Sequence, residues 1–344
     1  MSRWRAIVVG LATTVVLAAC AAAAMAVVRE PPARARTGSP RGAPGPSHAA
    51  PGPSHAALRR GARRASAPAR AVGVLCPSPS LGGTLPAEVY LPAGYSTRAA
   101  PYPVIYFLHG LPAGPTTYTT NGFVARALAA AHQRAIVVAP QGARSAGSDR
   151  EYLDWSPSEN WPAAIADDLP ACIDSRFNTI ANRWGRALMG LSAGGYGAFN
   201  IGLRNLQSFA AVESWSGYFV ATDPSGEHVL NLGSPAAQTA ATVPQGAGLR
   251  AALGSWPAFI GFYVGNQDAR FLQMNVRFDA ALRRGGITHV FRIYPGGHTG
   301  ALWRAHARLW LTWALRYLAA GRARQAGQAP PGPATSVSGG APVG

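Results

Sequence analysis

Lysine is absent from this chain of 344 residues, and acidic residues are scarce. The 31 Arg face 14 Asp and Glu, which gives a formal net charge of +17. This use of arginine, together with 40 Gly and 29 Pro, is typical of GC-rich coding rather than of selection for guanidinium chemistry. Residues 29–70 hold nine Arg against one acid, whereas residues 71–320 hold 18 Arg against 13 acids. Most of the excess charge therefore lies outside the main body of the chain, and nucleic acid is not an expected partner.

Cysteine is also scarce, with three residues in the whole chain. Cys76 and Cys172 both fall within residues 71–320, and an even pair in a protein outside the cytosol favours a disulfide. Two separate buried thiols are the alternative, because nothing in the sequence indicates that the two are adjacent. No metal site and no cofactor are expected.

The longest hydrophobic run lies at the N-terminus, where residues 6–28 are uncharged and apolar after a basic start. At about 1.5 Å per residue, this run is long enough to cross a bilayer core of roughly 30 Å. Residues 1–28 therefore form a predicted signal peptide or membrane anchor. Three outcomes are open: lipidation of Cys20 in a lipobox-like Leu-Ala-Ala-Cys, cleavage at small residues near 22–26, and retention as a single span.

Two segments have the composition of disordered chain. Residues 29–70 are rich in Pro, Ala, Arg, Gly and Ser and repeat one heptapeptide at 44–50 and 51–57, which predicts a linker without a core. Its arginines favour contact with a membrane surface or an anionic cell-wall polymer. Residues 321–344 have a similar composition and form a predicted disordered tail.

Apolar runs alternate with helical patterns between these ends, and residues 71–320 are expected to form one catalytic domain. The predicted strands lie at 71–75, 84–91, 104–108, 135–139, 187–189, 210–213, 259–264 and 290–294. The predicted helices lie at 121–132, 161–177, 193–204, 270–284 and 301–318. This alternation predicts an α/β fold with a mostly parallel sheet covered by helices on both faces, and a ligand site at the carboxyl ends of the strands.

The sequence Gly-Leu-Ser-Ala-Gly at 190–194 joins an apolar run to an Ala- and Gly-rich helical pattern. A strand, a sharp turn and a helix in this order form a nucleophile elbow, which holds a serine above the sheet in a strained backbone conformation. Side chains at Gly190 and Gly194 would clash in such a turn. The alternative is a chance occurrence of this motif in a glycine-rich chain. The assignment of a nucleophile elbow therefore requires an acid and a base for Ser192 elsewhere in the sequence.

In this architecture, the acid and the base that serve the nucleophile follow it along the chain. Asp268 comes directly after one predicted strand, and His298 lies in a glycine-rich loop after the last one. His289 begins a strand and His306 lies within an amphipathic helix, so both fit less well. Ser192, Asp268 and His298 are therefore the predicted catalytic residues.

Two backbone N–H groups are needed to stabilise the oxyanion of an acyl-transfer reaction. One belongs to Ala193, the residue after the nucleophile. The other is assigned to Leu111, in the loop after strand 104–108, because Pro112 has no N–H. His109 adjoins this turn, and we expect it to have a structural hydrogen-bonding role.

Several short motifs occur in a fixed order: Leu-His-Gly at 108–110, Asp154-Trp155, Gly-Leu-Ser-Ala-Gly-Gly at 190–195, Gly-Asn-Gln-Asp at 265–268, and Gly-Gly-His at 296–298 followed by Trp303. Together they resemble the esterase family of α/β-hydrolases that includes esterase D, feruloyl and enterochelin esterases and the antigen 85 mycolyltransferases, over residues 72–319. The resemblance implies an α/β-hydrolase fold, a Ser192–Asp268–His298 triad and oxyanion donors at Leu111 and Ala193. The sequence departs from many relatives at Gly300, where they carry an aromatic residue.

Three hypotheses of function follow. The first is an exported serine carboxylesterase, secreted or tethered to the outer face of a bacterial membrane, that hydrolyses small-molecule, glycan or lipid esters through an acyl-enzyme on Ser192. The second is acyl transfer to a sugar or cell-wall hydroxyl, with Asp154, Trp155 and Trp303 as candidate substrate-binding residues for either reaction. The third is a non-catalytic wall-binding or adhesin module on the same fold.

Overall fold

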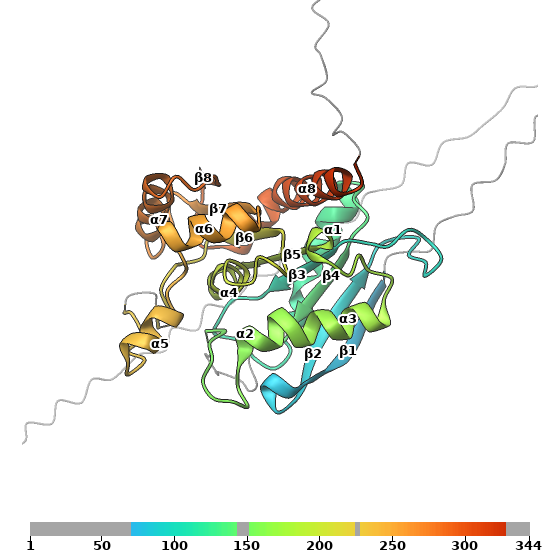
Figure 1. Ribbon diagram of the computed structural model, residues 1–344, viewed down its shortest axis with the longest axis horizontal. Helices are drawn as coiled ribbons and strands as arrows, with labels where there is room; N and C mark the ends of the chain where they lie inside the picture. Colours follow the sequence, from blue (N-terminus) through green and yellow to red (C-terminus); the bar gives the residue numbers. More distant parts are fainter. Residues whose placement is uncertain (1–69, 143–150, 224–227, 328–344) are drawn as a thin grey trace, which may run out of the picture. The chain divides into compact units, whose positions relative to one another are not determined.

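The computed structural model describes residues 70–142, 151–223 and 228–327 (Figure 1). They contain an 8-stranded sheet with the strand order β1-β2-β4-β3-β5-β6-β7-β8. The first pairing, β1 with β2, is antiparallel, as is that of β2 with β4, and all later pairings are parallel. The strands span Arg70–Ser78, Gly83–Leu91, Val104–Leu108, Ile136–Pro140, Arg186–Leu191, Ala211–Trp215, Phe259–Gly265 and Val290–Tyr294 for β1 to β8. The predicted α/β class with a mostly parallel sheet is confirmed.

Helices cover both faces of the sheet, as Figure 1 shows for α1 and α8 on one side and α3 and α4 on the other. The helices are α1 (Gly122–Ala130), α2 (Trp161–Ala163), α3 (Leu169–Arg176), α4 (Ala193–Gly202), α5 (Pro235–Ala240), α6 (Ala247–Ser255), α7 (Leu272–Arg284) and α8 (Gly300–Gln325). A π-helical turn at Ala164–Asp168 joins α2 to α3, and short 3-10 turns lie at Pro79–Leu81, Thr117–Asn121 and Arg183–Gly185.

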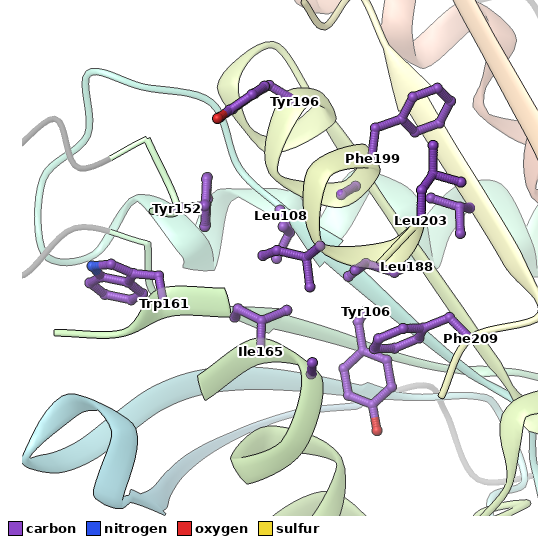
Figure 2. Close-up of a cluster of buried hydrophobic side chains, with 14 of the residues drawn as sticks. Tyr106, Leu108, Tyr152, Trp161, Ile165, Leu188, Tyr196, Phe199, Leu203 and Phe209 are labelled. Atoms are coloured by element: carbon purple, nitrogen blue, oxygen red, sulfur yellow. The ribbon is translucent and has the colours of Figure 1, made fainter. Parts of the chain in front are cut away.

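The central strands are buried on both faces, which explains their continuous apolar runs. In β3, Tyr106 and Leu108 belong to a core that includes α3 and α4, whereas Ile105 and Phe107 belong to a core that includes α1 and α8. Figure 2 shows part of the first core, in which the rings of Tyr106 and Phe209 meet edge to face at 6.0 Å. Alternate side chains of one strand therefore fill two separate cores.

The last helix is longer than the sequence predicted. α8 continues to Gln325, so residues 321–325 of the expected disordered tail are helical instead. The reason is packing against Trp184: a Cβ at Gly321 would lie 1.9 Å from the Trp184 ring, and Arg322 donates a hydrogen bond of 2.6 Å to the Trp184 carbonyl oxygen. Residues 321–325 resemble the linker in composition, but their contacts with Trp184 pack them against the rest of the domain.

A disulfide joins Cys76 in β1 to Cys172 in α3, across 96 positions of sequence. The sequence left two alternatives open for this pair, a disulfide or two separate thiols. The structure contains the disulfide. No helix of the described residues is both long and apolar enough to cross a membrane. The predicted signal or anchor with Cys20, the linker up to residue 69 and the tail from residue 328 lie outside the described residues.

Candidate active site

Ser192 lies at the junction of β5 and α4, with φ 55° and ψ −125°. A positive φ is costly for a residue with a side chain and persists only where surrounding contacts fix it. Here the Ser192 N–H donates to the Trp215 carbonyl oxygen at 2.9 Å. A Cβ at Gly190 would lie 2.4 Å from the Gly194 oxygen, and a Cβ at Gly194 would lie 2.2 Å from the Leu108 oxygen. The turn therefore needs both glycines, as the steric argument from the sequence expected.

Two loops bring His298 and Asp268 to Ser192. The His298 Nε2 lies 2.9 Å from Ser192 Oγ, and its Nδ1 lies 2.6 Å from Asp268 Oδ2. Asp268 is 2 % exposed, and its other oxygen accepts the Phe271 N–H at 3.3 Å. A carboxylate at Nδ1 favours the tautomer whose Nε2 lone pair faces the serine. In this arrangement the imidazole can accept the Ser192 proton while Asp268 stabilises the imidazolium.

Aromatic side chains fix the ring of His298 from two sides. Trp303 meets it edge to face at 5.1 Å, and Phe271 lies 5.2 Å away. The indole N–H of Trp303 donates to Ser216 Oγ at 3.1 Å. The sequence analysis expected Trp303 to bind substrate and did not identify Phe271 or Ser216. Ser216 could have been identified from its position in the sequence, because it directly follows β6 and so lies at the carboxyl edge of the sheet.

The loop after β3 lies against the serine. A Cβ placed on Gly110 would come within 3.1 Å of Ser192 Cβ, so the backbone approaches as closely as glycine permits. Neither the Leu111 N–H nor the Ala193 N–H donates to an acceptor within residues 70–142, 151–223 or 228–327. Both N–H groups are therefore available to a ligand oxygen as far as the described protein is concerned.

His109 is buried and serves the loop rather than the serine. Its Nε2 accepts the Gly142 N–H at 2.8 Å, and its Nδ1 lies 2.8 Å from the Gly110 oxygen. Burial lowers the pKa of His109, so the ring is neutral at physiological pH. The Tyr152 hydroxyl also donates to the His109 carbonyl oxygen at 2.7 Å. These bonds hold the loop that carries Gly110 and Leu111.

The two competing histidines have other partners. His289 Nε2 lies 2.8 Å from Asp279 Oδ1, and the His306 ring stacks on Tyr294 at 3.5 Å. Burial lowers the pKa of His306. Neither histidine hydrogen-bonds with Ser192.

Two hollows are relevant to substrate binding. A pocket of about 320 Å³ is lined by Gly110, Leu191 and Trp303 and so adjoins the serine. A larger groove of about 900 Å³ runs along the C-terminal half of α4 and is lined by Asp154 and Trp155. Neither lining includes Ser192, His298 or Asp268, but the pocket shares Gly110, Leu191 and Trp303 with the surroundings of this cluster and the groove does not. The structure therefore brings Trp303 to the cluster, whereas Asp154 and Trp155 line the groove.

Metal-ligating side chains do not cluster in the part of the chain that the structure describes: no group of three or more His, Cys, Asp or Glu residues there could hold a metal ion. The chemistry of the site is that of a hydroxyl, an imidazole, a carboxylate and backbone N–H groups.

Comparisons with known proteins agree with this architecture. A model of the family described as Putative esterase matches residues 78–307. Esterase Rv1288 of Mycobacterium tuberculosis is 31% identical over 132 residues, which cover 38% of this chain and 28% of that protein. The chain thus spans less than a third of the length of this curated relative.

Solved structures share the fold at low sequence identity. A ferulic acid esterase is similar with a TM-score of 0.60 and 23% identity, covering 72% of this chain and 98% of the other. Mycobacterium tuberculosis MPT51 has a TM-score of 0.53 and 18% identity, over 72% of this chain and 99% of the other. Because the family model matches well over half of the chain, the protein belongs to the Putative esterase family and has the α/β-hydrolase fold.

Proposed function

We propose that the protein is a serine carboxylesterase that hydrolyses its substrate through an acyl-enzyme on Ser192. The observation that carries this proposal is the unbroken hydrogen-bond chain from Ser192 Oγ through the His298 ring to Asp268 Oδ2, with both bonds at 2.9 Å or less. The family supports an esterase in general, and these three residues give that chemistry a nucleophile, a base and an orienting acid.

The proposed reaction has two halves. As Ser192 Oγ attacks the ester carbonyl carbon, its proton passes to His298 Nε2, and the oxyanion accepts bonds from the N–H groups of Leu111 and Ala193. Collapse of this intermediate breaks the ester C–O bond, and His298 returns the proton to the leaving alkoxide. A water molecule then attacks the acyl-enzyme by the same route, and the carboxylic acid leaves.

We also propose that this enzyme acts outside the cytoplasm. The apolar run at 6–28 supports export, and so does the Cys76–Cys172 disulfide, because such bonds persist mainly in oxidising compartments. In this proposal the arginines of 29–70 keep the enzyme near a membrane surface or an anionic wall polymer.

The test compares the full chain with Ser192→Ala and with Ser208→Ala, a serine in the turn after α4, on p-nitrophenyl butyrate. The first variant is expected to lose at least about a thousandfold in kcat, because the nucleophile is removed, and the second to keep wild-type turnover. Circular dichroism and melting verify folding. Unchanged turnover by Ser192→Ala would contradict the proposal.

The same samples separate the other two hypotheses. If the enzyme transfers acyl groups, adding trehalose to the acyl donor should give acylated trehalose in larger amount than the free acid released by hydrolysis. A non-catalytic binding module predicts no turnover of any ester by folded wild-type protein.

A further inference from the structure

We propose that the pocket beside Ser192 recognises an anionic group on the substrate, and that Arg304 is the residue that selects for it. This inference rests on the proposed esterase function and names a substrate class: esters that carry a carboxylate or phosphate within a few bonds of the scissile carbonyl, on either the acyl or the alcohol part.

Three segments far apart in the sequence build this anion pocket, which has a volume of about 320 Å³. The loop after β3 and the end of β5 provide its inner wall through Gly110 and Leu191, and a Cβ on Gly110 would touch Ser192. The 3-10 turn before α1 adds polar side chains, and the start of α8 adds Trp303 and Arg304. Because Gly110 and Leu191 also adjoin Ser192, one substrate molecule can reach both the serine and this pocket.

The lining of the pocket carries positive charge and no negative charge. Its ten residues include no acid, and Arg304 is its only arginine. His109 also lines the pocket, but both of its ring nitrogens are occupied and burial lowers its pKa, so it adds no charge. An ester with a negative group is thus the complementary ligand.

Arg304 is exposed, and its guanidinium has no acceptor among the described residues. Other exposed arginines such as Arg308 also have no partner there, and what distinguishes Arg304 is its place in the lining of the pocket. Gly300 creates the space for it, because a Cβ at that position would lie 2.7 Å from Arg304 Nη1. The missing side chain lets the guanidinium fold back over the first turn of α8, toward the pocket.

Two further features favour an anion at this place. Asn121 lines the pocket and is 2 % exposed, yet its Nδ2 donates to no acceptor within the described ranges. A buried amide without a partner is unfavourable, and a ligand oxygen would satisfy it.

The 26-residue helix α8 begins at Gly300 with no side-chain cap from Thr299 and no acid in its first turn. Its uncapped N–H groups add partial positive charge beside Arg304.

The test uses two matched pairs of esters. In one pair the charge is on the acyl part: p-nitrophenyl hydrogen adipate and p-nitrophenyl methyl adipate. In the other the charge is on the leaving group: 4-acetoxybenzoate and its methyl ester. We expect the wild type to prefer the anionic member of one pair by about tenfold in kcat/KM, the effect of one charge-assisted hydrogen bond at a partly solvated site. Which pair responds identifies the part of the substrate that enters the pocket.

Three variants assign the preference to its residue. Arg304→Gln is expected to abolish the preference, and Gly300→Ala to reduce it by displacing the guanidinium. Arg308→Gln is the matched control, an exposed arginine one turn along α8 that does not line the pocket, and it is expected to keep the preference. Added salt should shrink the wild-type preference, since screening weakens a partly exposed charge pair.

The outcomes separate this inference from the proposed function. Turnover of the neutral esters with no preference in either pair, or a preference that survives in Arg304→Gln, overturns the anion pocket and leaves the esterase intact. If no ester is turned over, the proposed function fails. The pocket can then still be tested by comparing the melting temperature of the protein with benzoate and with benzamide. Stabilisation by benzoate in the wild type and not in Arg304→Gln supports it, and no difference overturns it.

Discussion

Glu213 carries a carboxyl group that the fold buries away from any positive charge among its described hydrogen-bond partners. Its side chain is fully buried in β6, where Oε2 accepts the Trp215 indole N–H at 2.8 Å and Oε1 has no partner among the described residues. Burial raises its pKa from 4.5 to about 8, against the opposing effect of the Trp215 bond. The folded protein therefore keeps this carboxyl protonated where an unfolded chain would ionise it.

This shift predicts a pH dependence of stability with a definite sign. Below pH 4.5 both states hold the proton. Between about pH 4.5 and 8 only the folded state holds it, so the free energy of unfolding falls as pH rises, by several kcal/mol in total. Glu213→Gln keeps an acceptor for Trp215 and cannot ionise. Urea unfolding at pH 5 and pH 8 should show a smaller loss in the variant than in the wild type, and equal losses would contradict the protonated carboxyl.

At the residue scale, chain order was enough to predict that Ser192, Asp268 and His298 lie together. Ser192, Asp268 and His298 each follow a predicted strand, and the carboxyl ends of parallel strands meet at one edge of a sheet. Arg304 and Asn121 could not be identified in this way. They are 183 positions apart in sequence, and each has an ordinary surface or turn explanation until the fold brings them to the same pocket.

At the scale of elements, β1 and α3 are tied by more than packing. The Cys76–Cys172 disulfide joins them, and Asp168 just before α3 accepts bonds from the Ser78 hydroxyl at 2.7 Å and the Ser80 N–H at 3.1 Å. β1 is an edge strand with only β2 as its neighbour in the sheet. The covalent link therefore secures one of the two edges of this sheet.

Removal of the disulfide should destabilise the protein without altering the site. The Cys76→Ala/Cys172→Ala variant is expected to lose about 2–4 kcal/mol in free energy of unfolding, because a loop of this length restricts the unfolded chain strongly. Urea unfolding measures the loss, and reduced wild-type protein serves as the control with the same expected stability. A variant as stable as the oxidised wild type would show that the edge is held by the Asp168 bonds and packing alone.

The bounds of a helix or strand were predicted best where its hydrophobic pattern is strong. The continuous apolar run of Val104–Leu108 gave the bounds of β3 directly. β6 was predicted to end at Glu213 but continues to Trp215, because Ser214 and Trp215 still pair with both neighbouring strands, β5 and β7. Two short helices, α5 and α6, were not predicted, since α5 buries none of its residues and α6 buries Leu249 alone.

At the scale of the whole molecule, the chain belongs to the Putative esterase family, and all of the proposed chemistry lies at one edge of the sheet that the described residues form. Residues 29–70, where the excess of arginine is concentrated, include no residue of the proposed active site, and the proposal gives them a role in placement rather than in catalysis. The central claim is therefore about one atom, Ser192 Oγ, and its activation by His298.

A fluorophosphonate probe tests that claim most directly, because it forms a covalent bond only with an activated serine and needs no knowledge of the substrate. Full-length protein is labelled and examined by intact mass and peptide mapping, with Ser192→Ala as the matched sample. The account predicts one adduct per chain, on Ser192, and none on the variant. Folded wild-type protein that takes no label, or takes it at another serine, would contradict it.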